Sequence, residues 1–207
     1  MPKTPQPLTP KQEQQEHEMK VCGFFLSLFN MSFSTDYKWI RPGVEPEPDC
    51  ICNNGLNVEI TSIFYSTKYA ENYMRCWQKN ISPEEYTKRI DFFNERAESF
   101  AKLIPQLFKF LNDQVKDKLK KSETYRYNGK LILVINGMIT LTLDNGILDE
   151  YFKNKPDFKN NLFSEIWLLC GMGYNGRQSD GIVRLDLDGP NYTVFPETHH
   201  SKYTLNY

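Results

Sequence analysis

Apolar residues recur at helical spacing near the start of the chain and predict a helix from about residue 11 to residue 30. The apolar stripe of this helix consists of Val21, Phe24, Phe25 and Leu28. When the stripe is continued toward the N-terminus at about 100° per residue, it reaches Gln14, His17 and Glu18. Glu18 is therefore the acid of this helix that we expect to point toward the core.

Three short segments after this helix have the composition and alternation of β-strands. They cover residues 37–41, 49–53 and 56–63. Asn54-Gly55 separates the last two segments and is typical of a tight hairpin turn. Alternation along the third segment places Glu59 and Thr61 on one face and their apolar neighbours on the other. An acid inside an apolar strand needs a partner, because an unpaired buried carboxylate is costly.

A long helix is predicted next. The segment Ser82-Pro83-Glu84-Glu85 has the N-cap serine, first-position proline and third-position glutamate of a helix start. An apolar stripe continues to about Lys121, and we expect Pro105 to kink or divide the helix. Its basic residues alternate with acids, which favours a solvated face, and residues 116–121 are the best candidates for contacts with phosphate.

The remaining pattern adds strands to one sheet. We expect a strand buried on both faces, a short helix, a second buried strand and an edge strand, at residues 131–135, 148–153, 163–170 and 181–187. The glycine-rich segment 171–176 is interpreted as a plain turn. This order of helices and strands is typical of an α/β domain with a mixed central sheet flanked by helices.

Composition narrows the class of protein. The chain has 207 residues, of which 40% are hydrophobic, and this is enough for one domain with a substantial core. We expect a disordered lead-in at residues 1–10, a single domain at 11–190 and an aromatic C-terminal tail at 191–207. The net charge of −1 gives no overall preference for nucleic acid, so such a partner would have to meet a local basic surface.

Cysteine use and hydropathy favour a cytoplasmic protein. The five cysteines are an odd number without the spacing of a zinc site, and we expect reduced thiols, with Cys50 and Cys52 as small core residues. No apolar run has the length of a membrane span, and the N-terminus lacks the charged-then-apolar order of a secretory signal. We therefore expect no membrane partner.

Two acids lie in the predicted hairpin of residues 49–63. Asp49 stands near the start of its first strand and Glu59 stands inside its second. A hairpin that directs both acids inward can hold a divalent metal ion against a phosphate. Two plainer interpretations stay open: Asp49 as a turn residue after Pro48, and Glu59 as an edge-strand acid that faces water.

The order of these features resembles the PD-(D/E)xK nuclease superfamily. The features are an inward acid on a first helix, Pro48-Asp49, the hairpin, the segment Val58-Glu59-Ile60-Thr61, a helix and an apolar strand, and they cover residues 11–136. The resemblance is greatest to members whose second motif reads VEIT. It implies a restriction-endonuclease-like core and a hydrolase that cleaves phosphodiester bonds in DNA or RNA.

The resemblance also implies a metal site. Asp49 and Glu59 would be catalytic acids that bind Mg²⁺ or Mn²⁺, and Glu18 would match the glutamate that many members carry on the first helix. The metal ion of such enzymes orients and activates water and stabilises the charge that develops on the phosphate.

The sequence departs from the family pattern at its lysine. The lysine expected two residues after the second acid is Thr61 here. A threonine hydroxyl can orient a water molecule or bond a phosphate oxygen, but it brings no positive charge for the transition state. Lys88 is the substitute that we include in the catalytic set, and Lys68 and Arg89 are the alternatives.

Three hypotheses follow. The first is a metal-dependent nuclease that uses Asp49, Glu59 and Glu18. The second is a catalytically impaired protein on the same fold that binds nucleic acid or a protein partner, which the missing lysine favours. The third is an unrelated α/β protein in which the acidic hairpin is a coincidence. The sequence leaves open whether the protein is a homodimer.

Overall fold

The computed structural model describes most of the chain between residues 9 and 195. The described residues are 9–63, 84, 100–137, 142–143, 145–158, 162–174, 177–186 and 193–195. The predicted helix start at residues 82–85 lies outside them, apart from Glu84. Lys68, Lys88 and Arg89 also lie outside the described residues.

The first helix is the one that the apolar stripe predicts. α1 (Pro10–Phe33) begins one residue earlier and ends three residues later than expected. The Thr9 hydroxyl accepts the N–H of Gln12 at 3.4 Å, and the Gln12 side chain accepts the N–H of Thr9 at 2.8 Å. This capping box satisfies two backbone donors at the helix start. Thr9 and Pro10, which the sequence assigned to the lead-in, therefore open α1.

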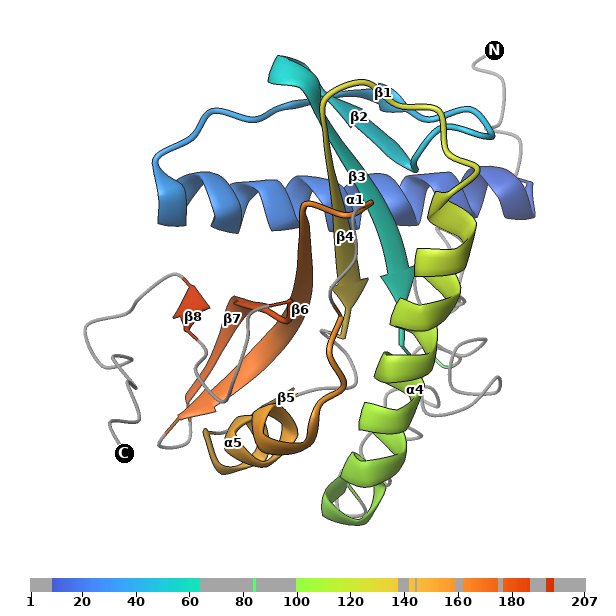
Figure 1. Cartoon of the computed structure of the whole chain (residues 1–207). Coiled ribbons are helices and arrows are strands. Elements are labelled where there is room, and N and C mark those ends of the chain that lie inside the picture. The colour runs from blue at the N-terminus through green and yellow to red at the C-terminus, as the bar shows by residue number, and fades with distance from the viewer. Residues whose placement is uncertain are drawn as a thin grey trace.

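One mixed sheet forms the centre of the described structure (Figure 1). Its strands are β1 (Trp39–Pro42), β2 (Cys50–Cys52), β3 (Leu56–Ser62), β4 (Lys130–Asn136), β5 (Thr142–Leu143), β6 (Glu165–Tyr174), β7 (Arg177–Arg184) and β8 (Val194–Phe195). Their order across the sheet is β1-β2-β3-β4-β6-β7-β8, and β5 pairs with β6. Two further helices are described, α4 (Phe100–Ser122) and α5 (Asn145–Asn154).

Strand directions divide the sheet into three parts. β1, β2 and β3 are antiparallel neighbours, β3, β4 and β6 run parallel, and β6, β7 and β8 are again antiparallel. The turn between β2 and β3 is the short 3₁₀ segment Asn53–Gly55. Asn54 and Gly55 have φ values of 54° and 70° there, a left-handed conformation that these two residue types tolerate best. The hairpin predicted from Asn54-Gly55 is confirmed.

Alternate residues of the central strand face two separate cores. Leu131, Leu133 and Ile135 of β4 pack in the α4-side core, with Leu111 and Val115 of α4. Ile132 and Val134 pack in the α1-side core, and the members of this core on α1 are Val21, Cys22, Phe25, Leu26, Leu28 and Phe29. All five β4 residues are 0% exposed. The prediction of a strand buried on both faces is confirmed, with one helix layer on each side.

The cysteine prediction is also confirmed for the described residues. Cys22, Cys50, Cys52 and Cys170 are free thiols and all four are buried. Cys50 and Cys52 pack against α1 together with Val58 of β3. They are the small core residues that their spacing on one strand predicted.

Three details differ from the sequence-based expectation. Residues 171–174, interpreted as part of a turn, continue β6, because β7 pairs with them from Gly171 opposite Asp180 to Tyr174 opposite Arg177. β7 has a neighbour on both sides, since the two-residue strand β8 covers the side away from β6. α4 continues through Pro105 from Phe100 to Ser122, so the proline does not divide the described helix.

The described helices were also compared with the requirements of a membrane span. None of those in the described part of the chain combines the length and the apolar character that crossing a bilayer requires.

A pair of glycine substitutions tests the fold. A Cβ on Gly129, whose φ is 96°, would lie 2.2 Å from the carbonyl oxygen of Gly55, whereas a Cβ on Gly23 in α1 would meet nothing within 4 Å. We expect Gly129→Ala to lower the free energy of unfolding by at least about 2 kcal/mol. Gly23→Ala should raise it by about 0.5–1 kcal/mol, because alanine favours the helix. Urea unfolding measures both, and equal stability of the two variants would contradict the close approach at Gly129.

Candidate active site

The candidate site lies at the open end of the β2–β3 hairpin, where β2 begins and β3 continues past it. The antiparallel register pairs Cys50 with Val58, and β2 begins there, whereas β3 runs on to Ser62. One step further along the same register, Asp49 lies opposite Glu59. Cross-strand neighbours in an antiparallel pair point to the same face of the sheet. Asp49 and Glu59 therefore share one face of the sheet, as a common metal site would require.

The two carboxylates take over the backbone hydrogen bonds that the missing strand would have made. The N–H of Asp49 donates to Oε2 of Glu59 at 3.2 Å. The N–H of Ile60 donates to Oδ2 of Asp49 at 2.8 Å. Each acid therefore accepts a hydrogen bond from the backbone of the other strand or its extension. These two reciprocal hydrogen bonds hold both side chains in fixed positions.

Two side chains from a distant part of the sequence complete the surroundings of Glu59. The Lys118 ammonium of α4 forms an ion pair with Oε1 of Glu59. The Tyr125 hydroxyl, three residues beyond the end of α4, donates to the same oxygen at 2.5 Å. Glu59 is only 3% exposed. It is thus a buried acid with a cation and a hydroxyl as partners, and the edge-strand interpretation of Glu59 is wrong.

Negative charge accumulates around the pair. Burial raises the pKa of Asp49 to about 7, and the charges of Glu59 and Glu18 act in the same direction against the charge of Lys118 and the N–H of Ile60. Burial also raises the pKa of Tyr125, and its hydrogen bond to Glu59 adds to this rise, so its hydroxyl stays protonated and donates. Among the described residues, the charge of one lysine, Lys118, thus acts against three acids that interact electrostatically.

Glu18 is near this pair without joining it. Burial raises the pKa of Glu18, the hydrogen bond from Gln14 and the charge of Lys118 lower it, and the charge of Glu59 raises it. Its Oε1 accepts a hydrogen bond from Gln14 at 2.8 Å. No three His, Cys, Asp or Glu side chains within the described ranges are placed to hold a metal ion together. Glu18 therefore does not complete a three-acid metal group with Asp49 and Glu59 in this structure.

The residue at the family's lysine position is engaged with α4. The Thr61 hydroxyl donates to Oε1 of Gln114 at 2.9 Å. Gln114 and Lys118 are one helical turn apart and meet Thr61 and Glu59, which are two residues apart on β3. Lys88, the substitute named from the sequence, lies outside the described residues, as do Lys68 and Arg89.

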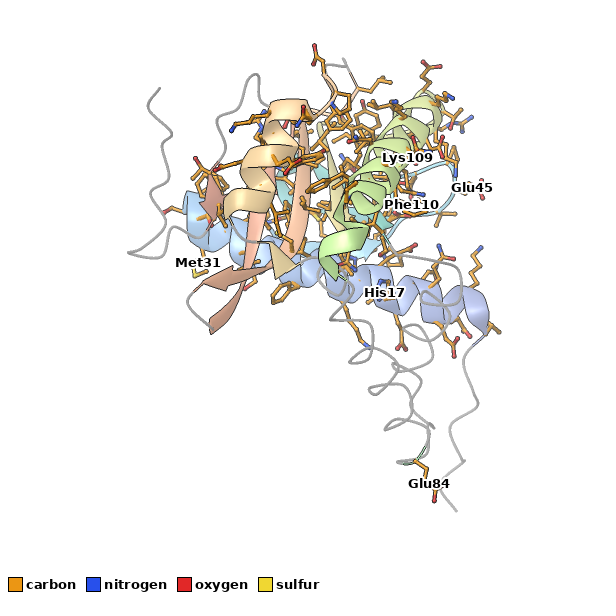
Figure 2. All side chains as sticks on the ribbon, turned by 90° about the horizontal axis from the view of Figure 1, so that it is seen from below. His17, Met31, Glu45, Glu84, Lys109 and Phe110 are labelled. Atoms are coloured by element: carbon orange, nitrogen blue, oxygen red, sulfur yellow. The ribbon has the colours of Figure 1, made fainter. Side chains whose placement is uncertain are left out.

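A polar contact between α1 and the sheet lies at the end of β3. Nε2 of His17 is 3.4 Å from the Ser62 hydroxyl, and the Asn136 amide donates to the same hydroxyl at 3.3 Å. Burial lowers the pKa of His17, and the charge of Lys20 acts in the same direction. Figure 2 shows His17 on the half of α1 that leads to the N-terminus, far from Met31 near the other end.

Lys118 and Tyr125 were not identified from the sequence as site residues. The signal for Lys118 was its spacing: the buried positions of α4 include Leu111, Val115 and Ser122, and Lys118 falls between the last two at helical spacing. It was included only in the basic segment 116–121, of which Lys116, Lys120 and Lys121 are exposed. Tyr125 follows the helix in a loop and had no periodic signal.

The two carboxylates of Asp49 and Glu59 are suitable ligands for a hard divalent cation. Oδ1 of Asp49 accepts no hydrogen bond from a described residue, and Oε2 of Glu59 accepts a single one. Mg²⁺ prefers oxygen ligands and is usually bound through one or two carboxylates, with water and phosphate oxygens as its other ligands. Asp49 and Glu59 can therefore supply the protein share of such a site.

The chain has no identifiable relative in the comparisons: no family model matches it, and neither does a curated protein or a solved structure.

The pKa of Asp49 predicts how metal-free stability depends on pH. The folded protein holds this pKa at about 7, above the ordinary value of 3.8, so folding favours the protonated acid. The contribution of Asp49 to stability is therefore complete below about pH 4 and is lost as the pH rises through about 7. Asp49→Asn keeps an acceptor for the Ile60 N–H and removes the charge.

We expect Asp49→Asn to gain stability relative to the unmodified chain as the pH rises from about 4 to about 8. Thermal unfolding in the presence of a chelator measures the difference at each pH. A difference in melting temperature that does not change with pH would contradict the raised pKa.

Proposed function

We propose that this chain is a metal-dependent nuclease with a restriction-endonuclease-like core. The observation that carries the proposal is the pair of opposed carboxylates, Asp49 and Glu59, held at the open end of a hairpin with Lys118 beside them. The activity is hydrolysis of a phosphodiester bond in DNA or RNA. In that reaction the oxygen of water bonds to phosphorus, and the bond from phosphorus to the leaving oxygen breaks.

The order of the elements supports the proposed core. Among the described elements, a helix, three antiparallel strands, a second helix and a strand parallel to β3 come in the order α1, β1 to β3, α4 and β4. Both acids lie at the open end of the β2–β3 hairpin, and α1 and α4 cover opposite faces of the sheet (Figure 1). This is the arrangement that the resemblance to the PD-(D/E)xK superfamily implies.

The excess of negative charge supports the proposed cofactor. Among the described residues, Asp49, Glu59 and Glu18 interact with one another and with one lysine, Lys118; burial raises the pKa of Asp49, and the charges of the other two acids add to this rise. A divalent cation would balance the charge and release the proton of Asp49 on binding. Mg²⁺ or Mn²⁺ supplies a Lewis acid that lowers the pKa of bound water and stabilises charge on the phosphate.

The residues of the chain have separate roles in this proposal. Asp49 and Glu59 hold the cation through carboxylate oxygens. Lys118 pairs with Glu59 and brings a positive charge to the site, which the threonine at position 61 cannot do. Lys118 is thus the described cation that takes the place of the family's lysine, while the role predicted for Lys88 stays a prediction.

A second candidate is a protein on the same fold that binds nucleic acid without cleaving it. The observation that favours it is the Thr61 hydroxyl, which is engaged with Gln114 and brings no charge. Lys118 is likewise committed to Glu59 in this structure. Retention of nucleic acid without cleavage in the experiment below would support this second candidate over the first.

Cleavage of plasmid, single-stranded DNA and RNA in the presence of Mg²⁺ or Mn²⁺ tests the proposal. We expect cleavage by the unmodified chain and a loss of about 100-fold or more in Asp49→Asn and Glu59→Gln, because each change removes a charge from the cation site. Mn²⁺ should also raise the melting temperature of the unmodified chain and not that of Asp49→Asn. Cleavage that persists in both variants would show that the activity belongs to a contaminant.

Substitution of the lysine gives a separate prediction with a matched control. We expect Lys118→Met to lower the cleavage rate by about 10-fold or more, because the positive charge beside Glu59 is lost. Lys116→Met, an exposed position on the same helix, should leave the rate unchanged. Circular dichroism melts establish that each variant is folded at the assay temperature, since Glu59 loses its buried partner in Lys118→Met. Equal rates in the two variants would remove Lys118 from the site.

A further inference from the structure

Tyr125 is held in place from two sides. The N–H of Tyr125 donates to the carbonyl oxygen of Ser122 at 3.1 Å, which ties it to the last residue of α4. The N–H of the next residue, Arg126, donates to the carbonyl oxygen of Pro46 at 3.0 Å. Pro46 belongs to the loop that leads to Asp49. The Tyr125 hydroxyl therefore approaches Glu59 from a segment fixed to both the helix and the acid-bearing loop.

The contacts of Glu59 divide its two oxygens. Oε1 receives the Lys118 ammonium and the Tyr125 hydroxyl, so its two lone pairs are both engaged. From the described residues, Oε2 receives only the N–H of Asp49, at 3.2 Å. Of the two Asp49 oxygens, Oδ2 accepts the N–H of Ile60 at 2.8 Å. Among the described residues, the capacity that is left on this pair is one position on Oε2 of Glu59, one position on Oδ2 of Asp49 and the Oδ1 atom of Asp49.

We propose that Tyr125 is a positioning residue for Glu59. Tyr125 and Lys118 together occupy Oε1 of Glu59, so that Oε2, beside Asp49, is presented to one divalent cation. The inference rests on the proposed function, because it names how the metal site of that function is arranged. Without the Tyr125 hydroxyl, Glu59 keeps Lys118 on Oε1 and the Asp49 N–H on Oε2, and the orientation of its carboxylate is less constrained. Loss of a partner that orients a metal ligand in this way typically lowers metal affinity by about 10–100-fold.

Tyrosine-to-phenylalanine changes at two neighbouring positions test the proposal. Tyr125→Phe removes the hydroxyl that contacts Glu59. Tyr127→Phe makes the same chemical change two residues away, where the hydroxyl donates to the carbonyl oxygen of Leu162 at 3.3 Å. Titration of the full chain with Mn²⁺, followed by the electron paramagnetic resonance signal of the free ion, gives the number of bound ions and their affinity. Tyrosine absorbance, recorded in the same titration, gives a spectroscopic signature of the contact.

We expect the unmodified chain to bind one Mn²⁺, Tyr125→Phe to bind it at least about 10-fold more weakly, and Tyr127→Phe to match the unmodified chain. Addition of Mn²⁺ should perturb tyrosine absorbance in the unmodified chain and in Tyr127→Phe, and not in Tyr125→Phe. The melting temperature of each variant is first measured in the presence of a chelator. The Mn²⁺ titrations are then run below these temperatures, so that folded proteins are compared.

Three results would overturn the inference. Equal Mn²⁺ affinity in the two variants, or an absorbance change that persists in Tyr125→Phe, would remove Tyr125 as a positioning residue and leave the proposed function standing. Two Mn²⁺ ions per unmodified chain would contradict the division of the carboxylate oxygens. An unmodified chain that binds no Mn²⁺ would overturn the proposed function itself, and the inference with it.

Discussion

Burial of β4 on both faces is the constraint on which the rest of the structure depends. Its alternate side chains fill two cores, so one helix layer is needed on each side, and α1 and α4 with α5 supply these layers. β3 lies parallel to β4 along its whole length, from Leu56 beside Lys130 to Ser62 beside Asn136. A strand in that position has little access to water. Any acid on β3 must therefore find partners inside the protein.

Glu59 is that acid, and the partners it finds create the site. β2 begins only at Cys50, so the N–H groups of Ile60 on β3 and of Asp49 before β2 have no partner across the hairpin. The carboxylates of Asp49 and Glu59 accept these two hydrogen bonds instead. Lys118 then balances one of the charges. The same contacts serve structure and chemistry, because the groups that orient the acids also leave specific oxygens open to a cation. The site therefore forms at the point where the pairing of β2 with β3 stops.

The sequence predicted the parts of this arrangement that have a local pattern. The acids were found because Pro48-Asp49 and Glu59 stand at fixed positions around an Asn-Gly turn, and β4 was found because a wholly apolar run marks a buried strand. Lys118 and Tyr125 contact Glu59 across 59 and 66 residues of sequence, and no periodicity encodes contacts at that distance. The extension of β6 through its glycines was missed for a related reason, since it depends on pairing with β7. Glu18 shows the limit of a helical stripe, which gives a direction but not a distance.

The close approach of Gly129 to Gly55 has a meaning for evolution. The two glycines lie 74 positions apart, yet Gly129 cannot gain a side chain without moving Gly55, because a Cβ on Gly129 would overlap the carbonyl group of Gly55. The turn of the acidic hairpin and the loop that follows Tyr125 are thereby fixed against each other. A distant relative that keeps the acids and this close approach is expected to keep a glycine at the position of Gly129, so this residue can serve as a mark of common descent in sequences too diverged for their motifs to be aligned.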